Sequence, residues 1–243
     1  MTLEYIIILL IIGVLSVIQS FFGMGVLVFG TPILLLMGYD FITTLGHLLP
    51  ASFVISLLQV LTGRSNRVPI SRYLYLLCLP GIAMGLWLTD YSLITSWTNK
   101  LVGGTLLLSA FVRFWSPSQR LILILLDRYL PSYHLVMGLT HGLTNLGGGL
   151  LVILASGMNN EKAAIRYTIA HYYLAFSSIQ MLLLATTMGN YGMIMSNLST
   201  AIVSGVVYLL VGNRIFKSIN NQYYNFALSF FITAYGIAIL LRF

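Results

Sequence analysis

Two glycine-rich stretches, each inside a long apolar run, carry backbone groups that could bind an anion. The first contains Gly23 and Gly25, and the second contains Asn145 and residues 147–149. Glycine allows a membrane helix to break, and a broken helix presents unpaired backbone N–H groups and the positive end of a helix dipole. Both favour a bound anion, without a buried Arg or Lys. These stretches therefore predict a compact, electropositive site that suits a small oxyanion.

The second stretch repeats the first after half the chain. Gly25 and Gly147 lie 122 positions apart in 243 residues. Helix breaks at corresponding places in two halves are typical of a transporter's binding site. The alternative is that these glycines only allow close helix packing, which is common in membrane helices. The residues predicted to bind the substrate are Gln19, Gly23, Met24, Gly25, Thr31, Thr144, Asn145, Gly147, Gly148 and Gly149.

The other polar residues inside the apolar segments limit the chemistry that the protein could perform. No Asp or Glu lies deep inside any apolar segment, so a buried carboxylate proton relay is not expected. His47, His141 and His171 titrate near neutral pH and are the candidates for proton coupling. They are too dispersed for a metal site, and neither a metal nor a cofactor is predicted. Most Ser and Thr hydroxyls should bond to their own helix, and Gln59 and Gln180 should bond between helices.

Composition indicates an integral membrane protein. Hydrophobic residues make up 58% of the chain and charged residues 7%, with a mean hydropathy of +0.94. A soluble domain of this size could not bury so much apolar surface. The net charge of +7 comes from Lys and Arg between apolar segments, where it reports orientation and not nucleic-acid binding. The single cysteine, Cys78, excludes an intrachain disulfide.

The predicted fold is an all-α polytopic membrane protein with two homologous repeats, residues 1–118 and 119–243, in one integrated membrane domain. Each repeat has four apolar segments, and the first segment of each is broken at its glycine stretch, as a re-entrant hairpin would be. The segments are 3–37, 41–61, 73–88, 94–114, 121–156, 163–186, 191–211 and 224–241. Pairs of like residues at a spacing of 121 support the duplication: Asp40 and Glu161, Ser56 and Ser177, Gln59 and Gln180.

The distribution of basic residues predicts the orientation. If the first and fifth segments enter the membrane and return, one face holds only Lys100 and Arg242 and the other face holds the remaining ten basic residues. That asymmetry is what the positive-inside rule expects of a plasma-membrane protein. The two halves then enter the membrane in opposite directions, with both termini outside the cytoplasm. The two hairpin tips are expected to meet near the membrane midplane.

The same residues resemble a known family. The pattern Gly23-Met-Gly25, Thr31-Pro32 and Gly38 is similar to that of the TauE/SafE family of sulfite and organosulfonate exporters, and so is the second stretch with Lys162-Ala-Ala after it. Asn145 stands where the second stretch of the family usually has glycine. The resemblance covers nearly the whole chain. It implies an inner-membrane permease that moves small sulfur-containing or carboxylate anions, with protons.

Two other functions stay open on the sequence. A polytopic membrane enzyme would use His141 or His171 with Ser156 or Asn145, although no metal cluster and no specific nucleophile motif accompanies them. A passive anion channel would use the same site as a transporter. The expected partners are a small anion and the lipid bilayer, with a homodimer left open and no nucleic acid.

Overall fold

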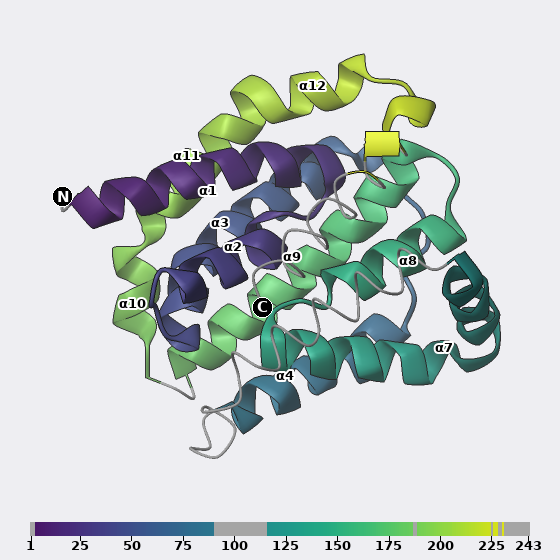
Figure 1. The fold of residues 1–243 in the computed structure, drawn as a ribbon, viewed down its shortest axis with the longest axis horizontal. Helices are drawn as coiled ribbons and strands as arrows, with labels where there is room; N and C mark the ends of the chain where they lie inside the picture. The colour runs from purple at the N-terminus through teal and green to yellow at the C-terminus, as the bar shows by residue number, and fades with distance from the viewer. Residues whose placement is uncertain (1–2, 90–115, 187–188, 225, 228–229, 231–243) are drawn as a thin grey trace. The chain divides into compact units, whose positions relative to one another are not determined.

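The computed structural model describes residues 3–89, 116–186, 189–224, 226–227 and 230. All regular elements in these residues are helical, which confirms the all-α prediction (Figure 1). The predicted segment 94–114 and most of the segment 224–241 lie outside the described residues. The prediction of two repeats therefore stays a prediction.

The chain divides into two compact units, and each unit contains residues from both halves of the sequence. Unit 1 comprises Met1–Val68 and Arg166–Ile219, and unit 2 comprises Pro69–Ile165 and Asn220–Phe243. The first glycine stretch lies in unit 1 and the second in unit 2. Each unit is therefore described on its own.

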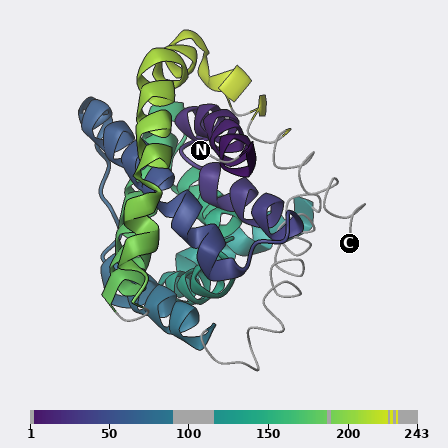
Figure 2. The same cartoon turned by 90° about the vertical axis from the view of Figure 1, so that its left-hand side faces the viewer.

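Unit 1 is a bundle built around the first glycine stretch. Its N-terminal part contains α1 (Leu3–Phe22), α2 (Val26–Leu36) and α3 (Phe41–Thr62), which pack against one another (Figure 1). Most of α9 (Lys162–Thr186) follows, and a last helical stretch flanks α1 and α3 (Figure 2). That stretch consists of α10 (Tyr191–Ser196), α11 (Leu198–Val207), the π-helical η3 (Tyr208–Gly212) and α12 (Asn213–Ser218).

Among the described residues, four helical stretches are long and apolar enough to cross a membrane. They are Leu3–Phe22, Phe41–Thr62, Lys162–Thr186 and Leu198–Ser218. At 1.5 Å per residue, the 20 residues of α1 reach the roughly 30 Å of a hydrocarbon core. The 11 residues of α2 cover only about half of it. Helix α1 is thus long enough to cross the membrane and α2 is not, and the re-entrant hairpin stays a prediction.

The helix α3 begins at a polar cap. Asp40 Oδ1 accepts a hydrogen bond of 2.9 Å from the Thr43 N–H, and Asp40 Oδ2 accepts one from the Thr43 hydroxyl. Partial burial raises the pKa of the Asp40 carboxyl, but the hydrogen bonds outweigh burial and hold the pKa below its ordinary value. The carboxylate at the positive end of α3 fixes where this spanning helix starts.

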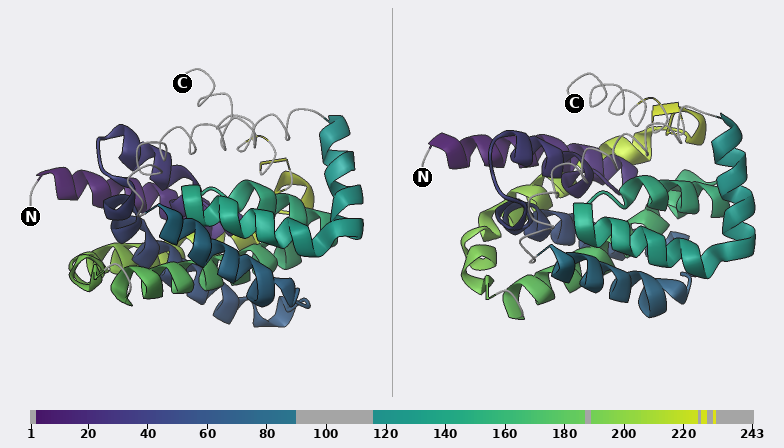
Figure 3. Two further views of the ribbon diagram at one scale, coloured as in Figure 1. Left: turned by 90° about the horizontal axis from the view of Figure 1, so that it is seen from below. Right: turned by 60° about the horizontal axis from the view of Figure 1, so that its bottom comes forward.

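Unit 2 contains the π-helical η2 (Leu74–Cys78), α4 (Leu79–Leu88), α7 (Ser116–Thr144) and α8 (Gly148–Met158). Figure 3 shows α4 lying along α7 after the bend in α7. The bend is at Tyr129, which has the non-helical angles φ −127° and ψ 35°, two residues before Pro131. Proline removes a helical hydrogen bond and displaces the preceding turn, which accounts for the kink within α7.

Glycines bring α4 and α7 into backbone contact. A Cβ atom added at Gly138 would lie 2.2 Å from Cys78 O, and one added at Gly142 would lie 2.3 Å from Ile82 O. Gly81 and Gly85 face the same contact from α4. Small residues at a spacing of four let two membrane helices approach closely. For these glycines the packing explanation is sufficient.

Candidate functional site

The first glycine stretch separates α1 from α2. Helix α1 ends at Phe22, and Gly23 follows with φ +85° and donates a hydrogen bond of 2.8 Å to Gln19 O. A positive φ after the last helical residue is the usual end of a helix, and glycine adopts it without strain. A Cβ atom at Gly23 would also lie 3.1 Å from Ile169 Cβ. Both the turn and the contact with α9 therefore require glycine.

The amide of Gln19 closes this break from inside the bundle. Its Oε1 accepts a hydrogen bond of 3.0 Å from Val26 N, the first helical N–H of α2. Its Nε2 lies 3.1 Å from both Ser52 Oγ and Ser56 Oγ on α3. A Cβ atom at Gly25 would lie 2.7 Å from Gln19 N, so Gly25 lets the two backbones touch. Gln19 thus holds α1, α2 and α3 together and occupies one N–H of the predicted anion site.

The carbonyl end of α1 is capped by two side chains from other helices. Gln59 Nε2 donates to Gln19 O at 2.8 Å and to Ser20 O at 3.1 Å. Arg166 Nη1, from α9, donates to Ser20 O at 3.1 Å. Cationic and N–H donors satisfy the last carbonyls of a helix and its negative dipole end. The bond that the sequence predicted between Gln59 and another helix is confirmed.

Arg166 corrects the prediction that no basic residue is buried near the break. Its side chain is only 7% exposed, and its guanidinium carbon lies 3.4 Å from the centre of the Phe216 ring. A signal for it was present, because Arg166 lies inside the predicted apolar segment 163–186. An ionisable residue within a membrane span is a functional candidate by default.

The second glycine stretch separates α7 from α8. Helix α7 ends at Thr144, and Asn145 follows with φ +62° and donates a hydrogen bond of 2.7 Å to His141 O. Asparagine tolerates this left-handed conformation better than other residues with a side chain. This explains how Asn145 can stand where the family usually has glycine. The Thr144 hydroxyl accepts from Leu146 N at 3.2 Å, and a Cβ atom at Gly147 would lie 2.7 Å from His141 Cβ.

The two breaks share several features, although the residue before the following helix differs in conformation, with φ 163° at Gly25 and φ −61° at Gly147. Each begins with a residue of positive φ whose N–H bonds to the carbonyl four positions earlier. Each is followed by a helix of 11 residues. The first turns of these helices also correspond, since Phe29 N donates to Gly25 O and Leu151 N donates to Gly147 O, both at 3.0 Å. In each of these comparisons, the two equivalent residues are 122 positions apart in the sequence.

The other predicted binding residues are buried or half-buried in their own units. In unit 1 Met24 is buried, and the buried Thr31 hydroxyl donates to Leu27 O of its own helix at 2.7 Å. In unit 2 Gly148 is buried and Gly149 is half-buried at the start of α8. The Thr144 hydroxyl donates to Thr140 O of its own helix at 2.6 Å, as the sequence predicted for most Ser and Thr. The prediction that both breaks line one site stays untested.

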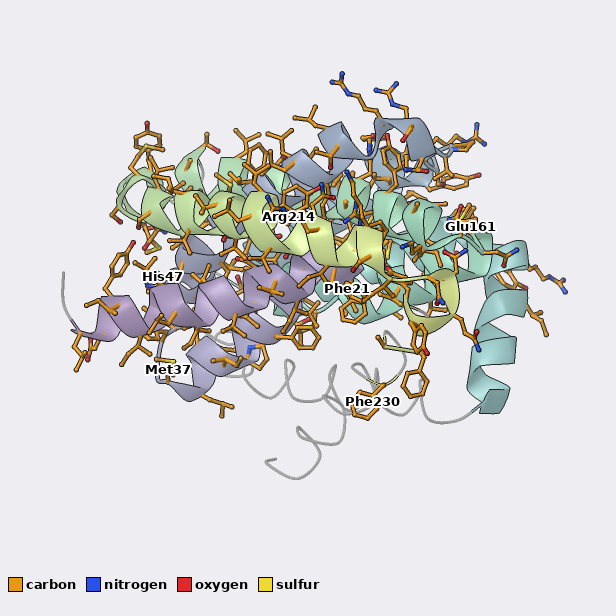
Figure 4. All side chains as sticks on the ribbon, turned by 90° about the horizontal axis from the view of Figure 1, so that it is seen from above. Phe21, Met37, His47, Glu161, Arg214 and Phe230 are labelled. Carbon is orange, nitrogen blue, oxygen red and sulfur yellow. The ribbon has the colours of Figure 1, made fainter. Side chains whose placement is uncertain are left out.

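The histidines occupy different environments. His47 Nδ1 lies 2.7 Å from Asn197 Oδ1, and the amide of Asn197 is oriented by a bond from its Nδ2 to Met193 O, so Nδ1 of His47 carries the hydrogen. Figure 4 shows His47 beside the N-terminal half of α1, whereas Phe21 marks the other end, at the break. The buried His141 is the histidine next to a break, and His171 is half-buried on α9.

A fourth histidine was not among the sequence candidates. His134 is buried on α7, and its Nδ1 lies 2.8 Å from Leu130 O of the same helix. In the described part of the chain, no group of three or more His, Cys, Asp or Glu side chains could hold a metal ion.

The comparisons with known proteins give one match. A family model described as sulfite exporter TauE/SafE matches residues 7–239. No curated protein and no solved structure matched the chain. The match includes both helix breaks and, apart from the first four residues of α1, the four helical stretches in the described residues that could cross a membrane. The chain therefore belongs to the TauE/SafE sulfite exporter family, and it is a membrane protein of the anion-exporter type.

Proposed function

We propose that this protein is a secondary transporter that carries a small sulfur-containing or carboxylate anion across the plasma membrane together with protons. The two helix breaks together form one anion site, and the site opens alternately to either side. The observation that carries the proposal is the set of features that the breaks at Gly23–Gly25 and Asn145–Gly147 share. Matching breaks in two halves of a transporter favour alternating access around a common site.

The short helices after the breaks supply the chemistry. Helices α2 and α8 each start at a break with the positive end of their dipole. Gly148 and Gly149 begin α8 and have no side chains, so a small oxyanion can approach the backbone N–H groups there. The membrane family and the absence of a nucleophile motif both favour transport over catalysis.

Flux measurements test this function. Purified protein in sealed liposomes should move sulfite, and an imposed pH gradient should drive sulfite to a concentration above that of the source compartment. Flux that only equalises the two concentrations, whatever the pH gradient, would identify a passive channel. Liposomes with the protein that take up no more sulfite than empty liposomes would contradict the proposal.

For proton coupling we expect His141 to be required. It lies on the last turns of α7, beside Gly147 at the second break, where protonation would change the charge next to the anion. His141→Gln should lose flux driven by a pH gradient by about tenfold or more, while exchange of sulfite for sulfite continues. The matched control is His47→Gln, since His47 lies far from the first break. If His141→Gln keeps the full pH dependence, another group carries the proton.

The orientation follows from the basic residues. We expect both termini outside the cytoplasm and the loop around Arg64 and Arg67 on the cytoplasmic side. Ser65 is exposed in this loop, and the buried Cys78 is the only other position that would react. In a Cys78→Ser background, Ser65→Cys should be labelled by an impermeant thiol reagent only after cells are permeabilised. Labelling in intact cells would show that this loop lies outside the cytoplasm and that the predicted orientation is wrong.

A further inference from the structure

Two membrane-length helical stretches of unit 1 run side by side in the same direction. Near the start of α1, the Tyr5 hydroxyl is hydrogen-bonded to Ser199 Oγ at the start of α11. Near the end of α1, the Phe21 ring packs against the Phe216 ring of α12, with ring centroids 6.4 Å apart. The stretch Leu198–Ser218 therefore starts and ends on the same sides of unit 1 as α1 does.

Helix α3 runs in this direction too. Near its start, His47 Nδ1 lies 2.7 Å from Oδ1 of Asn197, the residue before α11. At its end, the Thr62 hydroxyl is hydrogen-bonded to the hydroxyl of Tyr208, the first residue of η3. Figure 4 shows His47 well away from Phe21, toward the side where these helices start. Three parallel helical stretches thus end on one side of unit 1.

The charged residues of unit 1 are separated between these two sides. Its acidic residues, Glu4 and Asp40, lie at the starts of α1 and α3. Its basic residues lie on the side where the helices end. One of them, Arg166, is buried against the end of α1. The other four are exposed, and we call them the basic face: Arg64, Arg67, Arg214 and Lys217.

The basic face begins where a row of exposed apolar side chains ends. Leu61 is exposed at the end of α3, three residues before Arg64. Leu210 is exposed on η3, four residues before Arg214. Exposed apolar side chains of a membrane helix face the acyl chains, and Lys and Arg near the helix ends place their charges at the interface. The basic face therefore lies at the level of the lipid headgroups.

We infer that the basic face binds the headgroups of anionic phospholipids. Each Lys or Arg close to an anionic membrane surface strengthens such binding, and a guanidinium can donate to two phosphate oxygens at once. No acidic residue of unit 1 lies on this side to compensate the charge. The acyl chains lie against the exposed apolar side chains of α11 and η3, which are Ile202, Val206, Leu209 and Leu210. The inference concerns the surrounding membrane and does not depend on the identity of the transported anion.

The test measures lipid binding by the purified protein in neutral detergent micelles. Fluorescent phosphatidylglycerol is the anionic probe, and phosphatidylcholine with the same acyl chains is the zwitterionic comparison. The protein should bind phosphatidylglycerol about tenfold or more tightly than phosphatidylcholine, and high salt should weaken only the binding of phosphatidylglycerol. Glycerol phosphate, which carries the charge without the acyl chains, should not displace the bound lipid.

Variants of the basic face should lose this preference step by step. Each single change should lower the affinity for phosphatidylglycerol about fivefold and leave the affinity for phosphatidylcholine unchanged, which also shows that the variant is folded. Arg214→Lys should keep most of the affinity, because the charge remains. The changes are Arg64→Gln, Arg67→Gln, Arg214→Gln and Lys217→Gln, and the variant with all four should bind both lipids alike.

Two matched controls are exposed residues outside the basic face. Asn66→Ala changes an uncharged residue in the loop of Arg64, and Glu4→Gln removes a charge on the other side of unit 1. Both should bind phosphatidylglycerol like the wild type. The inference is overturned if the wild type binds both lipids alike, if the fourfold variant keeps the preference, or if glycerol phosphate displaces the lipid. Loss of the preference in either control would overturn it as well, since the basic face would then not be its cause.

Discussion

Asn145→Val should abolish sulfite transport, whereas Asn145→Gly should leave it close to the wild-type rate. Asn145 has φ +62° at the end of α7, and a β-branched residue is strained in that conformation by about 1–2 kcal/mol or more. Valine would therefore displace the turn that starts α8 and lower the melting temperature of the protein in detergent. Glycine adopts the same conformation freely and keeps the backbone N–H groups.

The comparison of glycine with valine at position 145 separates the contribution of the backbone to anion binding from that of the side chain. If the backbone binds the anion, glycine loses only what the Asn145 amide contributes, and Asn145→Ala should fall between the two. A protein with Asn145→Val that transports at the wild-type rate would show that the left-handed turn is not needed. A protein with Asn145→Gly that is stable but inactive would assign binding to the amide instead.

Gly138→Val should prevent unit 2 from forming. The added Cβ atom would lie 2.2 Å from Cys78 O, and backbone cannot move aside as a flexible side chain can. Overpacking of this kind costs about 3 kcal/mol or more, because α4 and α7 must separate along their length. We expect the variant to be degraded or to elute as an aggregate from size-exclusion chromatography.

The control for this prediction is Gly192→Val. Gly192 lies on α10, and a Cβ atom there meets no atom within 4 Å. This variant should elute and melt like the wild type. Monodisperse Gly138→Val with an unchanged melting temperature would mean that α4 and α7 do not pack as closely as the structure has them.

The features that could be predicted from the sequence are those that local chemistry decides. Apolar runs in a membrane form helices because lipid offers no hydrogen-bond partner to the backbone. The helix ends at Phe22 and Thr144 follow from residues that tolerate a positive φ, Gly23 and Asn145. The family could also be inferred, because its pattern consists of these same residues.

The features that could not be predicted depend on residues far apart in the chain. Arg166 is buried because its side chain reaches Ser20, which lies 146 positions earlier. The apolar segment around Arg166 was a signal of its burial, but nothing in the sequence identifies Ser20 as its partner. The role of Gln19 is similar, since its amide links α2 to two serines on α3, and only the fold brings these groups together. Buried polar networks of this kind are decided by tertiary packing.

The central claim is that the two breaks line a single anion site, and sulfite binding by variants of one break at a time tests it most directly. Gly25→Ala and Gly148→Ala each change one break, in different units. Gly30→Ala is the matched control, because Gly30 is buried on α2 and the nearest atoms to a Cβ there are the flexible side-chain ends of Leu48, at 2.6 Å, and Leu15, at 3.2 Å. If one site is shared, either break variant alone should lose essentially all sulfite binding, and Gly30→Ala should keep it. Wild-type binding by either break variant would contradict a shared site.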